Sequence, residues 1–363
     1  MRVLLISGSV SRLPDPVYPL GAAVVGTSLG TAGHQVSFFD ALRHEDAPST
    51  ALEKRLAEVE PDVVMMSIRN IDSAAFPGVH RHFEEHLDLA RACQRWGRAP
   101  LVLGGSGFSL MPEAFMAYLG ADHGVVGEGE RAAIELLAAL EAGDDPGRLI
   151  SADRVAPPFL APDRKLFDAD WYYQHGGMAN LQTQRGCQLR CVYCTYPLLE
   201  GHKVRPTVAQ GVVDELEAIK RAGIDHAFIV DAVFNRPEAH AAAICEEVLR
   251  RGLEMSLTGY FVPQGTLPEL PELLKRAGFD AVELGTDSLS DPVLEGMGKG
   301  FTADEAIDFS RRLSETGIVQ CHNLIFGGPG ETLETMEESV ARMDAIDPTG
   351  MIATIGLRIY PGT

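Results

Sequence analysis

The segment RGCQLRCVYCTYP, from Arg185 to Pro197, contains three cysteines in the spacing CxxxCxxC. The chain has six cysteines in 363 residues, so half of them lie within eight consecutive positions. Thiolates are soft ligands that favour zinc, copper(I) and iron–sulfur clusters. The spacing therefore indicates a metal-binding loop, because a disulfide would leave one of the three cysteines without a role.

Spacing alone leaves several uses of these cysteines open. A structural zinc site needs a fourth ligand, and the nearest candidate is His202. A thioredoxin-like pair of Cys191 and Cys194 leaves Cys187 unexplained. Three thiolates on one loop also suit an iron–sulfur cube, in which one iron stays open to a small chelating molecule. The remaining cysteines stand alone in apolar or helical surroundings and are expected to be buried: Cys93, Cys245 and Cys321.

Composition and charge exclude several classes of partner. The formal net charge of −20, from 31 basic and 51 acidic residues, repels a phosphate backbone, so we expect no nucleic-acid partner. No apolar run approaches the roughly 20 residues that span a bilayer, so we expect no membrane partner. At 45% hydrophobic and 23% charged residues, the chain is typical of a globular protein. Six cysteines are too few for a disulfide framework and favour a reducing, cytoplasmic location.

Residues 1–143 alternate short apolar runs with helical patterns. This alternation is typical of a parallel sheet covered on both faces, and it predicts a Rossmann-like, doubly wound α/β domain. Strands are expected at 2–9, 35–41, 62–70, 101–107 and 123–130. Helices are expected at 20–32, 51–58, 80–95 and 131–142.

The expected strand ends of this domain are rich in small and polar residues, as in Ser7-Gly8-Ser9 and the run from Gly104 to Gly107. Ligands of open α/β sheets bind at the carboxyl ends of the strands. However, no GxGxxG follows the first strand, which argues against a dinucleotide. Tight turns without a ligand remain an alternative reading of these glycines.

Residues 144–178 are rich in proline and are interpreted as a linker. Residues 179–363 then predict six strand–helix units, which make an incomplete TIM-like β/α barrel with its chemistry at the carboxyl ends of the strands. Its strands are expected at 179–186, 226–232, 255–262, 280–286, 319–326 and 351–359. The cysteine loop follows the first of them. Because the sequence stops just after the sixth strand, we expect it to be part of a longer protein.

The cysteine motif, with Tyr193 before its last cysteine, resembles the signature of the radical S-adenosylmethionine (SAM) superfamily. The wider chain resembles the cobalamin-dependent branch, which joins an N-terminal cobalamin-binding domain to a radical SAM barrel and consists mostly of class B methyltransferases. The stretches that carry this likeness are SIRNIDS (67–73), VLGGSGFS (102–109), GVVGEGE (124–130), CTYPLLEG (194–201), VDAVFN (230–235), VELGTDS (282–288), FGGPGET (326–332) and RIYPGT (358–363).

The resemblance implies a set of residues for the cluster and for SAM. Cys187, Cys191 and Cys194 would hold a 4Fe–4S cluster, whose open iron chelates the methionine part of SAM. Residues at the ends of the second, fourth, fifth and sixth barrel strands, together with the aromatic residue of the cysteine motif, would bind SAM itself. These are Tyr193, Asp231, Asn235, Glu283, Asp287, Ser288, Gly327, Gly328, Arg358 and Tyr360.

The resemblance also implies a cobalamin site. The Asp-x-His-x-x-Gly motif that offers a histidine to cobalt in other cobalamin enzymes is missing after the first strand, where the residues run from Ser7 to Arg12. Arg69 or Asn70 would then face the lower side of the corrin. The cobalamin-binding residues are expected to be Ser67, Arg69, Asn70, Gly104, Gly105, Gly107, Gly127, Glu128, Tyr196 and Pro197.

The function that the resemblance implies is a radical SAM methyltransferase that acts on a carbon centre of a small molecule or peptide. It would use a 4Fe–4S cluster, SAM and methylcobalamin, and an external electron donor would reduce the cluster. A cobalamin-dependent radical SAM enzyme that rearranges or cyclises its substrate without methyl transfer is the alternative. A methylthiotransferase acting on transfer RNA is a third reading, but it would need more cysteines in the N-terminal domain and a basic surface. A module that senses cobalamin or redox state without turnover is a fourth reading.

Overall fold

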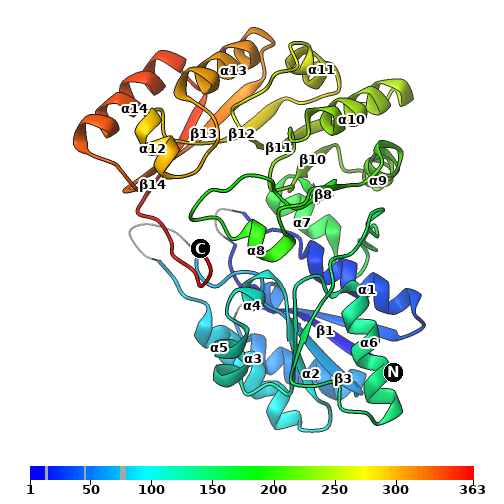
Figure 1. Cartoon of the computed structure of the whole chain (residues 1–363). Helices are drawn as coiled ribbons and strands as arrows, with labels where there is room; N and C mark the ends of the chain where they lie inside the picture. The colour runs from blue at the N-terminus through cyan, green and yellow to red at the C-terminus, as the bar shows by residue number, and fades with distance from the viewer. Residues whose placement is uncertain (13–14, 45, 74–78) are drawn as a thin grey trace. The chain divides into compact units, whose positions relative to one another are not determined.

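The computed structural model describes residues 1–12, 15–44, 46–73 and 79–363. The chain forms two compact units, Met1–Gly177 and Met178–Thr363, and each is built on its own six-stranded parallel sheet (Figure 1). The expected fold class, a Rossmann-like domain followed by a partial β/α barrel, is confirmed. None of the helices in the described part of the chain is both long and apolar enough to cross a membrane.

The sheet of the first unit has the strand order β2-β1-β3-β4-β5-β6, and every pair of neighbours is parallel. The order changes direction at β1, because the chain first adds β2 on one side and then β3 on the other. Such a point of reversal is where ligands of doubly wound sheets bind. The strands are β1 (Arg2–Ser7), β2 (Gln35–Asp40), β3 (Val63–Ser67), β4 (Leu101–Gly104), β5 (His123–Val126) and β6 (Leu149–Ser151).

The helices of the first unit form two groups of neighbours, α1 with α6, and α2 with α3 and α5. Their bounds are α1 (Leu20–Thr31), α2 (Pro48–Val59), α3 (Phe83–Trp96), α4 (Ser106–Leu110), α5 (Pro112–Leu119), α6 (Gly129–Ala142) and α7 (Ala169–Gly176), with a short 3₁₀ helix at Ala41–His44. The short helices α4 and α5 were not expected from the sequence.

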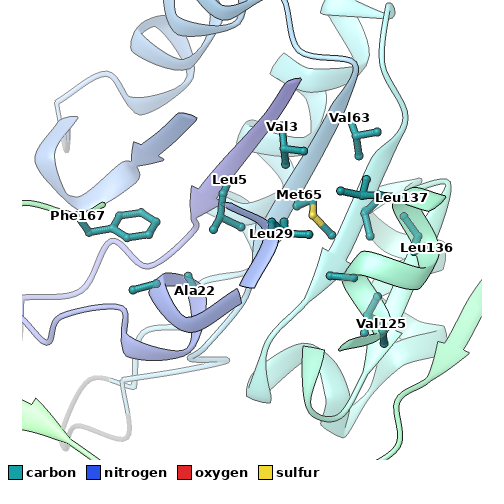
Figure 2. Packing of buried hydrophobic residues seen from close by; sticks show 14 of the residues in the cluster. Val3, Leu5, Ala22, Leu29, Val63, Met65, Val125, Leu136, Leu137 and Phe167 are labelled. Carbon is teal, nitrogen blue, oxygen red and sulfur yellow. The ribbon is translucent and has the colours of Figure 1, made fainter. Parts of the chain in front are cut away.

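The central strands are buried on both faces, which explains why they are continuously apolar. Val3 and Leu5 of β1 face a core that includes Leu29 of α1 and Leu136 of α6 (Figure 2). Leu4 and Ile6 alternate with them and are fully buried on the other face. Side chains alternate between the faces of a strand, so layers of helices on both faces are needed to bury all four.

Part of the segment that we interpreted as a linker belongs to the first sheet. β6 pairs in parallel with β5, and α7 follows it with Asp168 as its N-cap residue. Phe167 and Tyr172 from the same segment enter the core of the first unit. The sequence pattern missed β6 because this strand has only three residues, none of them buried.

The sheet of the second unit has the order β14-β13-β12-β11-β10-β7, again entirely parallel. These strands are β7 (Ala179–Leu181), β10 (His226–Ile229), β11 (Ser256–Phe261), β12 (Ala281–Asp287), β13 (Val319–Phe326) and β14 (Gly350–Ile355). A separate antiparallel pair is formed by β8 (Gln184–Arg185) and β9 (Arg205–Pro206).

The expected strand at 179–186 is divided into β7 and β8. The backbone amides of Thr183 and Gln184 donate to the carboxylate of Asp231, at 2.7 and 3.1 Å, rather than to a neighbouring strand. A side chain that takes these donors ends the parallel ladder, so β8 turns away to pair with β9.

Helices between the strands complete the second unit. They are α8 (Tyr196–Glu200), α9 (Ala209–Arg221), α10 (Glu238–Arg251), α11 (Leu270–Arg276), α12 (Asp291–Gly296), α13 (Ala303–Glu315) and α14 (Leu333–Ile346). One face of the central strands packs on these helices, as His322 and Leu324 of β13 show by their complete burial. The residues between them, Cys321 and Asn323, are partly exposed and define an accessible inner face.

Candidate functional site

The cysteine motif lies on the loop that leaves β8, and backbone hydrogen bonds hold this loop at several points. The amide of Cys187 donates to the carbonyl of Gly201 at 3.0 Å, and the amide of Cys194 donates to Cys191 at 3.1 Å. The amide of Val192 donates to the carbonyl of Met297 at 3.0 Å. The loop is therefore fixed both by its own turn and by a distant segment of the barrel.

Gly298 lets that distant segment approach the cysteine loop. Its φ is +70°, and a Cβ added there would lie 2.6 Å from the carbonyl oxygen of Arg190. No side chain fits at that distance, so only glycine allows the contact beside Cys191. The MGKG sequence around Gly298 is thus part of the same site as the cysteines.

The three thiols of the motif are available as ligands. Cys187 is buried, Cys191 and Cys194 are partly exposed, and all three are free. Soft thiolate ligands are those that hold iron–sulfur clusters, so the donor set fits a 4Fe–4S cluster.

A buried ion pair lies beside the cysteines. Lys299 Nζ donates to Asp287 Oδ2 at 2.5 Å, and both side chains are about 5% exposed or less. Tyr193, within the cysteine motif, donates its hydroxyl hydrogen bond to the same carboxylate. Asp287 has a left-handed backbone with φ of +61° at the end of β12. One lysine, one carboxylate and one phenol thus connect the end of β12 to the cysteine loop.

Burial raises the pKa of all three thiols, to about 11 for Cys194. The positive charge of Lys299 acts in the opposite direction on each of them. Although burial disfavours a charged lysine, Asp287 and the neighbouring thiols keep the pKa of Lys299 above its ordinary value. Lys299 is therefore a permanent cation next to the ligands. A cation in this place favours thiolates and added negative charge on the group that they hold.

Two predicted SAM-binding residues have their polar atoms engaged within the protein. Asp231 is fully buried and accepts hydrogen bonds from the backbone of Thr183 and Gln184 and from the Thr183 hydroxyl. The amide of Asn235 donates to Val262 and Gln264, and its oxygen accepts from the backbone amide of Val262 at 3.0 Å. In the structure both side chains position strand ends, and their contact with SAM stays a prediction.

The predicted residues after β12 and β13 show a similar pattern. The hydroxyl of Ser288 is 3.0 Å from that of Ser339 and accepts from the backbone of Ser290. The amides of Gly327 and Gly328 donate to the carboxylate of Glu331. These loops are closed on themselves, so SAM would have to share or replace some of these hydrogen bonds.

Glu283 is the predicted residue that lies most clearly on the inner face of the barrel. It is paired across the sheet with Tyr260 of β11 and Cys321 of β13. Burial raises the pKa of Glu283, although a hydrogen bond with Asn323 opposes the shift. The sequence analysis did not single out Tyr260 or Asn323. Only the alternation of side chains along each strand could have pointed to them, because it places them on the same face as Glu283.

The remaining predicted residues of the second unit lie at its surface or in α8. Arg358 is exposed and lies over the partly exposed ring of Tyr360, with 5.9 Å from its guanidinium carbon to the ring centre. Tyr196 and Pro197 form the first turn of α8 and are partly exposed. The backbone amide of Tyr196 donates a hydrogen bond to the thiol of Cys194, so the start of α8 lies next to the cysteine group.

The predicted cobalamin residues of the first unit lie at the carboxyl edge of its sheet, whereas Tyr196 and Pro197, also predicted to bind cobalamin, belong to the second unit. Ser67 ends β3, and Arg69 and Asn70 follow it with partly exposed side chains. The turn after β4, with Gly104 at the end of that strand, packs directly on this loop. A Cβ on Gly105 or Gly107 would lie 2.5 Å from Ile68 O or 2.7 Å from Arg69 O, respectively. These glycines therefore allow the two loops to make close backbone contact.

Two further predicted residues follow β5. The amide of Gly127, which has φ of +95°, donates to the hydroxyl of Ser109 at 3.0 Å. Glu128 precedes α6 and accepts from the backbone of Val155 at 2.7 Å. The edge of the first sheet is thus made mostly of backbone and small residues, which fits the broad face of a macrocycle.

Lys299 is the main residue of the site that the sequence analysis missed. It lies 105 residues after Cys194, between two glycines, with no recognisable motif of its own. Only the proximity of the MGKG turn to the cysteine loop shows its importance. The two flanking glycines in an otherwise helical region were the only signal that could have pointed to it.

Comparison with known families agrees with this geometry. The model of the radical SAM superfamily matches residues 181–343, and the model of the B12 binding domain matches residues 7–137. The first match covers the cysteine loop with Lys299, and the second covers the glycine-rich edge of the first sheet. The chain therefore combines a region similar to a B12 binding domain with a region similar to the radical SAM superfamily.

Three methyltransferases are similar to this chain over nearly all of its length. A tryptophan 2-C-methyltransferase from Streptomyces laurentii is 27% identical over 429 aligned residues, which cover 97% of this chain and 72% of the relative. The methyltransferase TsrM from Kitasatospora setae has been solved with cobalamin and a [4Fe-4S] cluster, and it is 29% identical to this chain with a TM-score of 0.89. The match covers 100% of this chain and 73% of the TsrM chain. An uncharacterized methyltransferase from Pyrococcus horikoshii is 26% identical over 100% of this chain and 82% of its own length.

Proposed function

We propose that this protein transfers a methyl group to a carbon atom of an aromatic amino acid or a related small molecule, using a 4Fe–4S cluster, SAM and cobalamin. The observation that carries the proposal is the likeness of the whole chain, in both units, to tryptophan 2-C-methyltransferases. TsrM has also been solved with its tryptophan substrate and a SAM analogue, at 28% identity and a TM-score of 0.89.

When bound, these cofactors supply the methyl group and the electron chemistry that side chains lack. The protein's own residues hold and shape the site. Cys187, Cys191 and Cys194 provide three thiolate ligands. Lys299, kept charged by Asp287, provides a fixed positive charge next to them. This charge is already in place before any reaction, so no reorganisation is needed to stabilise an electron arriving there.

The inner face of the barrel offers polar groups for a small zwitterionic molecule. Tyr260 and Glu283 are neighbours across the sheet, and Asn323 hydrogen-bonds to Glu283. Phe228 lies near Tyr260, with ring centres 4.8 Å apart at an interplanar angle of 66°. A phenol, a carboxylate and an amide beside an aromatic pair can orient an amino group and pack against an adenine or indole ring.

The direct test is methyl transfer by anaerobically reconstituted protein. The assay supplies the protein, loaded with cluster and cobalamin, with SAM carrying a labelled methyl group, a chemical reductant and a panel of aromatic amino acids. We expect a labelled product one methyl group heavier than tryptophan or a close analogue of it. With tryptophan deuterated at ring carbon 2, loss of the deuterium would locate the new bond.

The controls separate methyl transfer from other radical chemistry. The variant Cys194→Ala, which lacks one cluster ligand, should give no product, whereas Cys245→Ala, at a buried cysteine outside the motif, should retain activity. Release of 5′-deoxyadenosine with a product of unchanged mass would instead identify an enzyme that rearranges or cyclises its substrate. No SAM-derived product with any substrate would contradict the proposal. We also propose an external one-electron donor and a reducing, cytoplasmic setting, which the free thiols favour.

A further inference from the structure

A second group of metal-ligating side chains lies in the first unit, on the connection between β3 and α3. Two arms of this connection pair in antiparallel fashion. The amide of Ser73 donates to the carbonyl of His80 at 2.9 Å, and the amide of His82 donates to Ile71 at 3.0 Å. Asp72 and Arg81 form the bridge between these hydrogen bonds. Because side chains alternate along an extended arm, His80 and His82 lie on the same side of it.

The start of α3 brings a carboxylate to the same place. His82 is the N-cap residue, and Glu85 is the third residue of the helix. A side chain at this position reaches back toward the N-cap, as in a capping box. Here the carboxylate of Glu85 contacts Nε2 of His80. The spacing H-x-H-x-x-E thus brings two imidazoles and one carboxylate together.

The ligand atoms of His80, His82 and Glu85 all lie within 4.8 Å of one another. Ligands on a tetrahedral zinc ion are bound at about 2.0–2.2 Å, so their atoms lie about 3.4 Å apart. Two histidines and one glutamate are also a ligand set that zinc sites use when a fourth position stays open to water.

An independent observation points to a missing ligand. His82 is only 4% exposed, and neither of its ring nitrogens has a hydrogen-bond partner among the described residues. The second carboxylate oxygen of Glu85 is also buried without a partner. A buried polar atom without a partner is unfavourable for folding. A bound cation would take one ring nitrogen of His82 and the unpartnered oxygen of Glu85 at once.

The group does not include every carboxylate near it. Glu84, the neighbouring residue on α3, is exposed and is not part of the group.

We propose that His80, His82 and Glu85 bind one divalent transition-metal ion of the zinc class, separately from the cluster and cobalamin. The ion ties the arm at 80–82 to the first turn of α3. This arm is paired with Ile71–Ser73, which directly follow Arg69 and Asn70 at the edge of the sheet. The ion is therefore a structural clamp on the loop after β3. His80, whose side chain is 60% exposed, provides the access from solvent.

The test measures zinc on the complete protein, reconstituted with iron–sulfur cluster and cobalamin so that the cysteines are occupied. After dialysis against Zn²⁺ and desalting, mass spectrometry counts zinc, iron and cobalt per chain. We expect one zinc per chain in the unmodified protein, and an affinity at least about tenfold weaker in Glu85→Gln and His80→Asn. Glu84→Gln and His44→Asn, which change exposed residues of the same unit, are the matched controls and should bind as the unmodified protein does.

Two readouts keep the outcome independent of enzyme activity. Far-ultraviolet circular dichroism and cobalt content verify that the variants are folded. Zinc-edge X-ray absorption should show nitrogen and oxygen neighbours at about 2.0–2.2 Å and no sulfur neighbour. Zinc content that is the same in Glu85→Gln and Glu84→Gln, a sulfur shell, or no bound zinc would each overturn the proposal and leave an ordinary histidine–glutamate pair.

Discussion

The two sheets of this protein share one architecture but differ in what they present at their carboxyl edges. The first sheet presents backbone and small residues, such as Ser67 and Gly105, with few charged groups. The second presents three thiols and a buried ion pair of Lys299 and Asp287. The strand topology therefore decides only where a ligand can bind. The loops decide whether it is held by shape or by charge.

The largest effect should come from the cysteine loop of the second unit. Replacing one ligand, as in Cys191→Ala, should abolish the 4Fe–4S cluster, because two thiolates cannot hold the cube. Iron content and visible absorption after anaerobic reconstitution should fall close to background, while cobalamin content stays the same. Cys245→Ala, at a buried cysteine outside the motif, should keep its iron. Full iron binding by Cys191→Ala would show that the cysteine motif does not hold the cluster, and the contrast drawn between the two sheet edges would then be wrong.

The next largest effect should come from breaking the ion pair of Lys299 and Asp287 beside the cysteine loop. Lys299→Met leaves Asp287 as an uncompensated buried charge and should lower the free energy of unfolding by about 3–5 kcal/mol. The double variant Lys299→Met/Asp287→Asn should recover most of this loss, since neither charge remains. Urea unfolding of the apoprotein measures both.

The same variant should make the cluster harder to reduce, because a nearby cation no longer stabilises the added electron. Redox titration followed by electron paramagnetic resonance should give a more negative potential for Lys299→Met. An unchanged potential would show that Lys299 serves stability alone.

Asp231 gives a pH-dependent test within the second unit. Burial, opposed by three hydrogen bonds, raises its pKa from 3.8 to about 7. The folded state therefore binds a proton that the unfolded state releases, and this contribution is complete below pH 4 and is lost as the pH rises through 7. The isosteric Asp231→Asn should lack it. From pH 4 to pH 8 the unmodified protein should lose up to about 4 kcal/mol relative to the variant. Parallel stability profiles in urea would contradict this account.

The smallest expected effect tests the edge made of small residues. Gly105→Ala places a Cβ 2.5 Å from Ile68 O at a residue with φ of +100°, and should cost about 2–3 kcal/mol. It should also lower cobalamin binding, because the loop that carries Arg69 must move. Gly21→Ala, in α1 with no atom within 4 Å of the added Cβ, should be neutral or stabilise by up to about 1 kcal/mol. Equal cobalamin content in the two variants would contradict a role for this close contact.

Most of the fold could be predicted from the sequence, because buried parallel strands are continuously apolar. The strands around Val3 and Val63 are of this kind, and they were expected within a few residues of their actual bounds. β6 could not be predicted, since a three-residue edge strand without buried residues has no apolar pattern. The break between β7 and β8 depends on Asp231, which lies 48 residues away from Thr183.

The candidate site was predictable to the extent that it is encoded by local spacing. CxxxCxxC identified Cys187, Cys191 and Cys194. Lys299 could not be found, because a single lysine between glycines has many uses, and only folding brings it to the cysteine loop. Polar strand-end residues such as Asn235 were recognised as special from the sequence. Whether such a residue faces a ligand or supports a neighbouring strand depends on contacts that no local pattern contains.

The turn at 297–299 serves the cysteine loop in two ways within three residues. The carbonyl of Met297 accepts the amide of Val192, and the side chain of Lys299 supplies the adjacent positive charge. The same turn therefore determines both the position of the cysteine loop and the charge next to it, and a shift of this turn alters both together. Natural variation in a short stretch of the barrel, remote in sequence from every ligand, can thus adjust how readily the metal centre takes up an electron.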